Sequence, residues 1–288
     1  MSRKDFGILL LLAFTWGGSF LFMRIASPEL GPVFTTELRV TIAGAALLLY
    51  ALLIRHKLGI LKHWKPFLLL GGINAALPFT LICMAELHIS ASLAAILNAT
   101  TPMFAALAAW GTRREKPGAA KTAGLIMGLA GVVVLVGWSP LPLTGTVLLS
   151  VGYSLGAALC YAFGGLYASR AGSGLSPLAL AAGQQLGAGV VLLPLAVIFA
   201  PEHLPSSAAV YSVLGLSLLC TSVAYLLYFR LIASIGPVKT VSVTFLVPVF
   251  GLMWGVLFLH EHVYANTIAG LVIILLSVML MNRRPRKT

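Results

Sequence analysis

Charged residues are scarce in this chain, and acidic residues are the scarcest. Only 9% of the 288 residues are charged, with 19 basic and 7 acidic side chains, whereas a soluble domain carries about 25%. So few charges cannot cover the surface of a soluble globule, and a hydrophobic content of 59% is far too high for a disordered chain. The composition therefore excludes both classes and leaves a membrane-spanning protein.

Cysteine is nearly absent as well. Cys83, Cys160 and Cys220 lie in separate apolar stretches. An odd number of cysteines without short spacing predicts neither a disulfide framework nor a zinc site. The segment His260-Glu261-His262 does not have the spacing of a zinc-binding helix motif. We therefore expect no metal and no cofactor, and we interpret the cysteines as small packing residues.

Long apolar runs predict an all-α integral membrane protein with ten transmembrane helices. A helix needs roughly 20 apolar residues to cross the hydrocarbon core, and these runs lack the alternation of β-barrel strands. The first run is too long for the apolar part of a signal peptide, so we expect it to be retained. The expected spans are residues 6–26, 32–54, 66–86, 92–111, 118–137, 143–169, 177–199, 208–229, 239–259 and 264–282.

The basic residues predict the orientation of these spans. If both termini are cytoplasmic, 17 of the 19 basic residues fall in cytoplasmic segments, and Arg24 and Arg39 lie within helices. The net charge of +12 then marks topology in the cell (inner or plasma) membrane rather than a nucleic-acid partner. The 17 residues are Arg3, Lys4, Arg55, Lys57, Lys62, Lys65, Arg113, Arg114, Lys116, Lys121, Arg170, Arg230, Lys239, Arg283, Arg284, Arg286 and Lys287.

The chain also repeats itself at a nearly constant offset. Residues 1–140 and 141–288 each hold five predicted helices, and an odd number of helices requires the second copy to be inverted in the membrane. Inverted repeats are typical of secondary transporters, which rock one half against the other to give alternating access. The matched pairs are Pro32 with Pro177, Gly44 with Gly189, Pro102 with Pro248, Phe104 with Phe250, and Glu115 with Glu261.

Several motifs resemble the ten-helix EamA-domain exporters of the drug/metabolite transporter superfamily. The resemblance covers essentially the whole chain and extends to the YddG-type exporters of amino acids, particularly aromatic ones. The second half departs from the pattern, because Tyr161 and Gln184 occupy the places of Trp16 and Arg39. The motifs are residues 13–20 (AFTWGGSF), Pro32, Glu37-Leu38-Arg39, and Thr101-Pro102 leading into Arg114-Glu115, with Val247-Pro248 and His260-Glu261 as the second copy.

The resemblance implies export of amino acids (aromatic or neutral) or other small organic metabolites through a central cavity between the repeats. Export of cationic drugs is the alternative. Polar and aromatic residues at membrane depth are the candidates for lining the cavity, because buried polar groups usually face a cavity or a partner helix and aromatic rings suit an organic substrate. The expected substrate-binding residues are Trp16, Ser19, Arg39, Phe79, Asn98, Thr101, Phe104, Tyr161, Tyr225 and Thr244.

Pro102 and Pro248 each remove a backbone donor in mid-span, and we expect a broken or hinged helix at each. Arg39 should lie about 10 Å inside the outer end of its span. There it either binds a substrate carboxylate or pairs with Glu37 or Glu86, and we favour the pairing. Two alternatives remain for the driving force of transport: facilitated diffusion, or coupling to protons that Glu37 carries.

Two rival classes are less consistent with the sequence. An intramembrane enzyme needs a nucleophile with a base, or a metal cluster, at one depth, and the six histidines lie at predicted membrane boundaries or in loops. A channel usually has rings of charged residues or a carbonyl filter in an oligomer. We therefore expect a monomeric transporter and not an enzyme, with a small-molecule substrate and the bilayer as its partners.

Overall fold

The computed structural model describes residues 2–113, 118–138, 142–171, 174–240 and 242–281. Within these residues, eight helices are long and apolar enough to cross a membrane. Two apolar helices of 17 residues, Val243–Leu259 and Ala265–Met281, bring the total to ten. The expected all-helical membrane fold is therefore confirmed.

Several spans consist of more than one helical segment, so the number of segments exceeds the number of spans. In chain order they are α1 (Arg3–Leu30), α2 (Pro32–Leu53), α3 (Trp64–Gly71), the π-helix η1 (Gly72–Ala76), α4 (Leu77–Glu86), α5 (Ala91–Asn98), α6 (Thr101–Arg113), α7 (Ala119–Gly137), α8 (Gly145–Ala171), α9 (Pro177–Ile198), α10 (Ser207–Leu214), the π-helix η2 (Gly215–Val223), α11 (Ala224–Ile235), α12 (Pro237–Thr240), α13 (Val243–Leu259) and α14 (Ala265–Met281).

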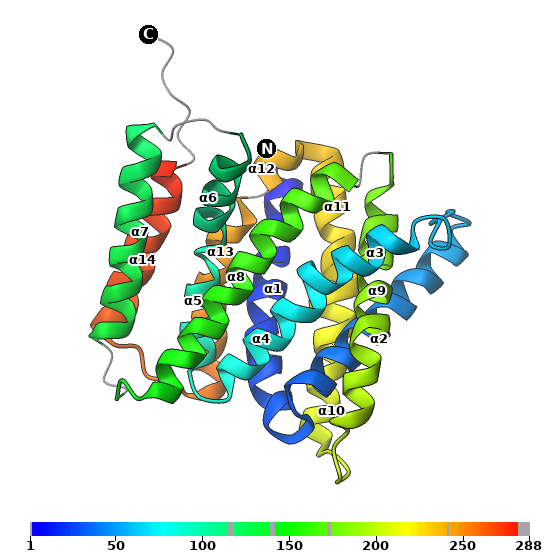
Figure 1. Ribbon diagram of the computed structural model, residues 1–288, viewed down its shortest axis with the longest axis horizontal. Coiled ribbons are helices and arrows are strands. Elements are labelled where there is room, and N and C mark those ends of the chain that lie inside the picture. Colours follow the sequence, from blue (N-terminus) through cyan, green and yellow to red (C-terminus); the bar gives the residue numbers. More distant parts are fainter. Residues whose placement is uncertain (1, 114–117, 139–141, 172–173, 241, 282–288) are drawn as a thin grey trace.

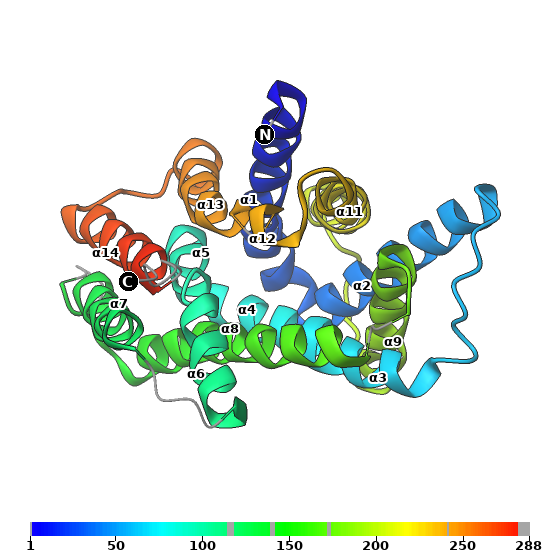
Figure 2. The same cartoon turned by 90° about the horizontal axis from the view of Figure 1, so that it is seen from above.

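The helices form one bundle whose two ends are easily told apart (Figure 1). The start of α1 and the end of α14 lie at the same end, which we call the terminal face. The α1–α2 junction and the start of α10 lie at the other end, which we call the distal face. Seen from the terminal face (Figure 2), α7 and α14 pair at one edge, while α2, α3 and α9 group at the other.

The inverted repeat is visible in the helix boundaries. Helices α2 and α9 are both 22 residues long, begin with proline, and start 145 positions apart. Helices α7 and α14 start 146 positions apart. Helix α2 runs from the distal to the terminal face and α9 runs the opposite way (Figure 1). The boundary between the halves, predicted at residue 140, lies outside the described residues.

Spans three and eight occupy equivalent places in the two repeats, and each contains a π-helix, η1 or η2. A π-helix weakens the normal backbone ladder, and such turns often mark functional sites. In η2, the hydroxyls of Thr221 and Ser222 donate to carbonyls five residues earlier, at 2.8 and 3.0 Å. These side chains satisfy backbone acceptors that the wider turn leaves available.

The two prolines expected to interrupt their helices behave differently. Span four stops at Asn98 and restarts at Thr101, immediately before Pro102. Pro248, by contrast, lies inside the continuous helix α13, so a break at this residue is not present. Spans one and eight also run several residues beyond their predicted limits, to Leu30 and Ile235.

An acidic side chain joins the two repeats at the distal face. Glu261, in the connection between α13 and α14, accepts hydrogen bonds from the backbone N–H groups of Ala91 (2.7 Å) and Ser92 (3.0 Å). These are the first residues of α5, where backbone donors lack intrahelical partners and the helix dipole favours a negative charge. Glu261 therefore caps a helix of the first repeat from the second.

Removing this cap should destabilise the protein measurably. Glu261→Ala leaves two buried donors unpaired, at a cost of about 1–3 kcal/mol, so we expect a lower midpoint of thermal unfolding in detergent. Glu261→Gln retains an acceptor oxygen, so its unfolding midpoint should lie between those of the wild type and Glu261→Ala. The neighbouring, exposed His262→Ala is the control. Equal midpoints for Glu261→Ala and His262→Ala would contradict the capping role.

Candidate functional site

The first of two related side-chain clusters surrounds Arg39 of α2, which is buried in the middle of the bundle. Its guanidinium carbon lies 3.5 Å from the centre of the Phe79 ring of α4. Its Nε donates to Thr221 Oγ1 in η2 at 3.1 Å, and Nη1 lies 3.5 Å from the sulfur of Met23. The Phe79 ring meets Tyr161 of α8 edge-on, with centroids 6.2 Å apart.

The second cluster surrounds Gln184 of α9, also buried. Its Nε2 donates to the hydroxyl of Tyr225 in α11 at 2.7 Å, and its Oε1 accepts from Asn74 Nδ2 in η1 at 2.7 Å. The Tyr225 ring meets Trp16 of α1 edge-on at 6.4 Å, and Trp16 also contacts Tyr228 at 5.4 Å.

The two clusters are related by the internal repeat. In each, a side chain on the second helix of one repeat contacts an aromatic ring on the third helix of its own repeat. The same side chain also reaches the π-helix of the other repeat. The aromatic ring in turn packs on a ring from the first helix of the other repeat. The corresponding residues are Arg39 with Gln184, Phe79 with Tyr225, Tyr161 with Trp16, and Thr221 with Asn74.

The chemical difference between the two clusters is one charge. The first, which we call the Arg39 half-site, contains a guanidinium, and the second, the Gln184 half-site, contains a neutral amide. A guanidinium stacked on an aromatic face is stabilised by the cation–π interaction. A carboxylate is the natural further ligand for such a group, because it can accept two parallel N–H bonds.

The expected ion pair between Arg39 and Glu37 or Glu86 is not formed among the described residues, although Glu86 interacts electrostatically with Arg39 and Arg24 at longer range. Glu37 Oε1 accepts from Thr41 at 2.7 Å and its Oε2 has no partner in the described structure. Glu86 is fully buried, and neither of its oxygens has a hydrogen-bond partner among the described residues. The aromatic ring of Phe79 takes the place that an acid was expected to fill, because π-stacking also accommodates a guanidinium.

The remaining expected residues lie on α1, at the α5–α6 break, in α6 and in α13, and are not members of the two clusters defined above. Asn98 ends α5 with its side-chain oxygen unpartnered in the described structure, while Thr101 begins α6 and donates to the Asn98 carbonyl at 2.8 Å. Ser19 is buried against Cys220 of η2. Phe104 is half-buried in α6 and Thr244 half-buried in the first turn of α13.

Asn74, Thr221 and Tyr228 also belong to the half-sites and were not predicted. Gln184 was identified only as the residue in the place of Arg39. An amide at membrane depth, such as Asn74, was a usable signal, because buried polar groups in membranes generally have a partner. No sequence pattern distinguished Thr221 from the neighbouring Ser222.

Large, fully buried side chains occur at both ends of the bundle and are more frequent toward the distal face. Met23, Ile82, Ile96 and Leu216 lie in the distal halves of their spans, and Leu12, Leu47, Phe67 and Leu231 lie in the terminal-face halves. The helices α6 and α11 form the terminal-face halves of spans four and eight, and α11 buries only two residues. Trp16, Tyr161, Tyr225 and Tyr228 remain half-buried between these regions.

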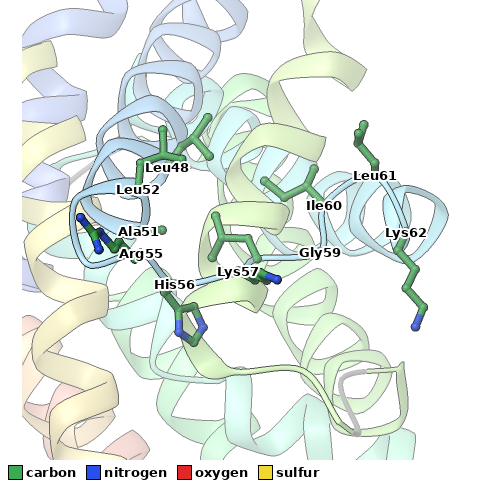
Figure 3. A pocket seen from close by; sticks show the side chains of 11 residues that line it. Leu48, Ala51, Leu52, Arg55, His56, Lys57, Gly59, Ile60, Leu61 and Lys62 are labelled. Atoms are coloured by element: carbon green, nitrogen blue, oxygen red, sulfur yellow. The ribbon is translucent and has the colours of Figure 1, made fainter.

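Two described pockets lie at the ends of the bundle, away from the half-sites. One, of about 630 Å³, is formed by the end of α2 and the α2–α3 connection at the terminal face (Figure 3). The other, of about 360 Å³, lies beside α10 at the distal face. Within the described residues, no group of three potential metal ligands occurs.

These features define an integral membrane protein of two inverted five-helix repeats with a polar–aromatic centre. The sequence pattern of the EamA-like transporter family matches residues 5–137 and 148–283, one match in each half. The chain belongs to this family, within the drug/metabolite transporter superfamily, and is a membrane transporter.

Relatives similar in sequence carry transporter names. An uncharacterized transporter, YvbV, of Bacillus subtilis is 26% identical over 97% of this chain and 92% of its own length. The uncharacterized inner membrane transporter YedA of Escherichia coli is 29% identical over 87% of this chain and 81% of its own. A solved crystal structure with 17% identity covers 98% of this chain and 97% of its own, with a TM-score of 0.69, and shares the fold.

Proposed function

We propose that this protein is a secondary transporter that exports amino acids, aromatic or neutral, by alternating access. The observation that carries the proposal is that, among the described residues, no carboxylate is hydrogen-bonded to the guanidinium of Arg39, although Glu86 lies within electrostatic range. A cation at membrane depth is costly and usually has a counter-ion, yet its hydrogen-bond partners here are a hydroxyl and a thioether. A substrate carboxylate bound at Nη2 would supply a hydrogen-bonded counter-ion.

The rest of an amino acid matches the surroundings of Arg39. Half-buried rings from α1, α8 and α11 offer apolar contact to a side chain, and the faces of Trp16 and Tyr161 attract an ammonium group. The amides of Gln184 and Asn74 add neutral hydrogen-bonding groups on the opposite half-site. A purely cationic drug would meet the guanidinium at this position, which disfavours the alternative function.

Alternating access follows from the repeat. Close packing at the distal face supports a state that is closed there, and the sparsely buried α6 and α11 support access from the terminal face. With both termini cytoplasmic, this state faces inward, and the related state with exchanged packing faces outward. We further propose that a single chain suffices, because both half-sites come from one polypeptide, and that it acts without catalysis.

Transport by the purified protein in liposomes tests the proposal. Saturable counterflow of L-phenylalanine, weak counterflow of its amide and none of tetraphenylphosphonium are the expected results, since only the first carries a carboxylate. Empty liposomes reconstituted in parallel measure leakage. Strong efflux of tetraphenylphosphonium without any amino-acid transport would instead establish a cationic compound exporter.

The coupling to protons is a separate question within this proposal. Glu37 holds one hydrogen bond, to Thr41, and lies where α2 meets α9. If it carries the proton, a pH gradient drives accumulation and Glu37→Gln abolishes that accumulation while counterflow persists. If transport is facilitated diffusion, the gradient has no effect on either protein.

A further inference from the structure

The α2–α3 connection, residues 54–63, forms a hook that projects sideways from the bundle at the terminal face (Figures 1 and 2). Its path is ordered by backbone bonds, including His56 N–H to the Ala51 carbonyl at 2.8 Å and Lys62 N–H to the Gly59 carbonyl at 3.1 Å. Gly59 has a φ of 62°, which glycine adopts without strain and which lets the hook turn back.

The hook is strongly basic. Arg55, Lys57 and Lys62 line the pocket of about 630 Å³ together with His56. No acidic residue occurs between Glu37 and Glu86 in the sequence, so the chain of the hook supplies no neutralising carboxylate. Clustered lysine and arginine at the end of a membrane helix attract anionic lipid headgroups.

The same hook is unusually apolar for a loop. Leu61 is 91% exposed, and Leu52 and Leu53 at the end of α2 are also exposed. Trp64, a residue type that favours the membrane–water interface, follows directly and is half-exposed to the surroundings. These side chains need hydrocarbon around them, which places the hook at the edge of the bilayer rather than in free solution.

The apolar side chains and two of the basic ones point to different sides of the pocket. In Figure 3, Leu48, Ile60 and Leu61 point toward one side of the view, His56 and Lys62 point toward the other, and Arg55 lies at the opposite end of the pocket from Lys62. A phospholipid has the same division, with a phosphate at one end and acyl chains at the other. A soluble anion would leave the apolar side chains without a contact, and an uncharged lipid would leave the basic side chains without a counter-ion.

We propose that this pocket binds one anionic phospholipid from the leaflet at the terminal face. The anionic headgroup lies along the row of basic residues Arg55, Lys57 and Lys62, and an acyl chain follows Leu48, Leu52 and Leu61. His56 Nε2 lies 2.7 Å from Ser176 Oγ, whose oxygen caps α9. The lipid therefore sits where the second helices of the two repeats, α2 and α9, are joined.

Lipid binding to the full chain in a neutral detergent tests this without any transport measurement, so its result is independent of the proposed function. Native mass spectrometry would count phosphatidylglycerol and phosphatidylcholine of identical chains retained on the protein. We expect selective retention of phosphatidylglycerol. The triple variant Arg55→Gln, Lys57→Gln, Lys62→Gln should lose about a hundredfold in apparent affinity, because each charge contributes about fivefold.

Matched controls separate the site from general effects of charge and apolarity. Lys4→Gln, Lys121→Gln, Arg230→Gln removes three exposed cations from the same face and should leave affinity within twofold. Leu61→Ser should weaken retention of phosphatidylglycerol, whereas Leu204→Ser, an equally exposed change at the distal face, should not.

Three results would overturn the proposal. Equal retention of both lipids would remove the role of charge, and equal losses in both triple variants would show only a general attraction to the basic face. Full competition by soluble glycerophosphoglycerol would indicate an anion site that does not use the acyl chain. All the variants change exposed side chains, so folding is expected to be unaffected.

Discussion

Replacing Arg39 with glutamine should reduce the affinity for L-phenylalanine by about tenfold to a hundredfold in proteoliposome counterflow. A hydrogen bond to a charged partner contributes about 1.5–3 kcal/mol, and this variant removes the charge while keeping a polar side chain. The substitution also places the same residue type at position 39 as at position 184, so that both half-sites become neutral.

The substrate amide provides the internal control for this variant. Because the amide has no carboxylate, its weak transport should remain unchanged or improve in Arg39→Gln, and the preference for the acid should disappear. The preference of Arg39→Lys for the acid should lie between those of the wild type and Arg39→Gln, because lysine keeps the charge but lacks the planar guanidinium that binds a carboxylate through two bonds. A variant that transports both compounds as wild type does would remove Arg39 from the binding site.

Gly187→Ala should cause a large loss of stability at the contact between the repeats. A Cβ at this position would lie against the backbone of Phe67 in α3, with the carbonyl carbon only 2.6 Å away. Overpacking usually costs about 1–3 kcal/mol of stability. We expect a cost at the upper end of this range, because the neighbouring atoms belong to the backbone and cannot move away as a side chain can. We expect a fall of roughly 6–10 °C in the thermal unfolding midpoint.

A second glycine shows whether the effect is local. Gly152, in the first third of α8, has no atom within 4 Å of an added Cβ. Gly152→Ala should therefore be neutral or slightly stabilising, because alanine favours a helix over glycine by about 1 kcal/mol. If both variants unfold at the same temperature, close contact between α3 and α9 does not limit stability.

The sequence alone was sufficient to predict the helical architecture. Ten apolar runs and the alternation of basic residues predicted the spans, because the hydrocarbon thickness fixes helix length. The repeat offset of 145 or 146 positions matched the boundaries of α2 with α9 and of α7 with α14. Individual ends were less predictable: α1 includes Glu29, whose carboxylate accepts from Ser206 at 2.8 Å.

The centre of the site was only partly predictable. Trp16, Arg39, Phe79, Tyr161 and Tyr225 were identified from their residue types and depth. Their pairing across the repeats depends on tertiary geometry that no spacing encodes. The choice between an acid and an aromatic ring as the neighbour of Arg39 was not decidable from sequence, because both types occur at suitable depth.

The paired π-helices rotate the second part of spans three and eight in the same sense. A π turn holds one residue more than an α turn, so the residues after it lie about 100° around the axis from their α-helical positions. This rotation sets the directions of Phe79 after η1 and Tyr225 after η2. Since each repeat has a π-helix in its third span, Phe79 and Tyr225 reach corresponding places in the two half-sites. The two rings therefore meet partners that differ mainly in charge, the guanidinium of Arg39 in one half-site and the neutral amide of Gln184 in the other.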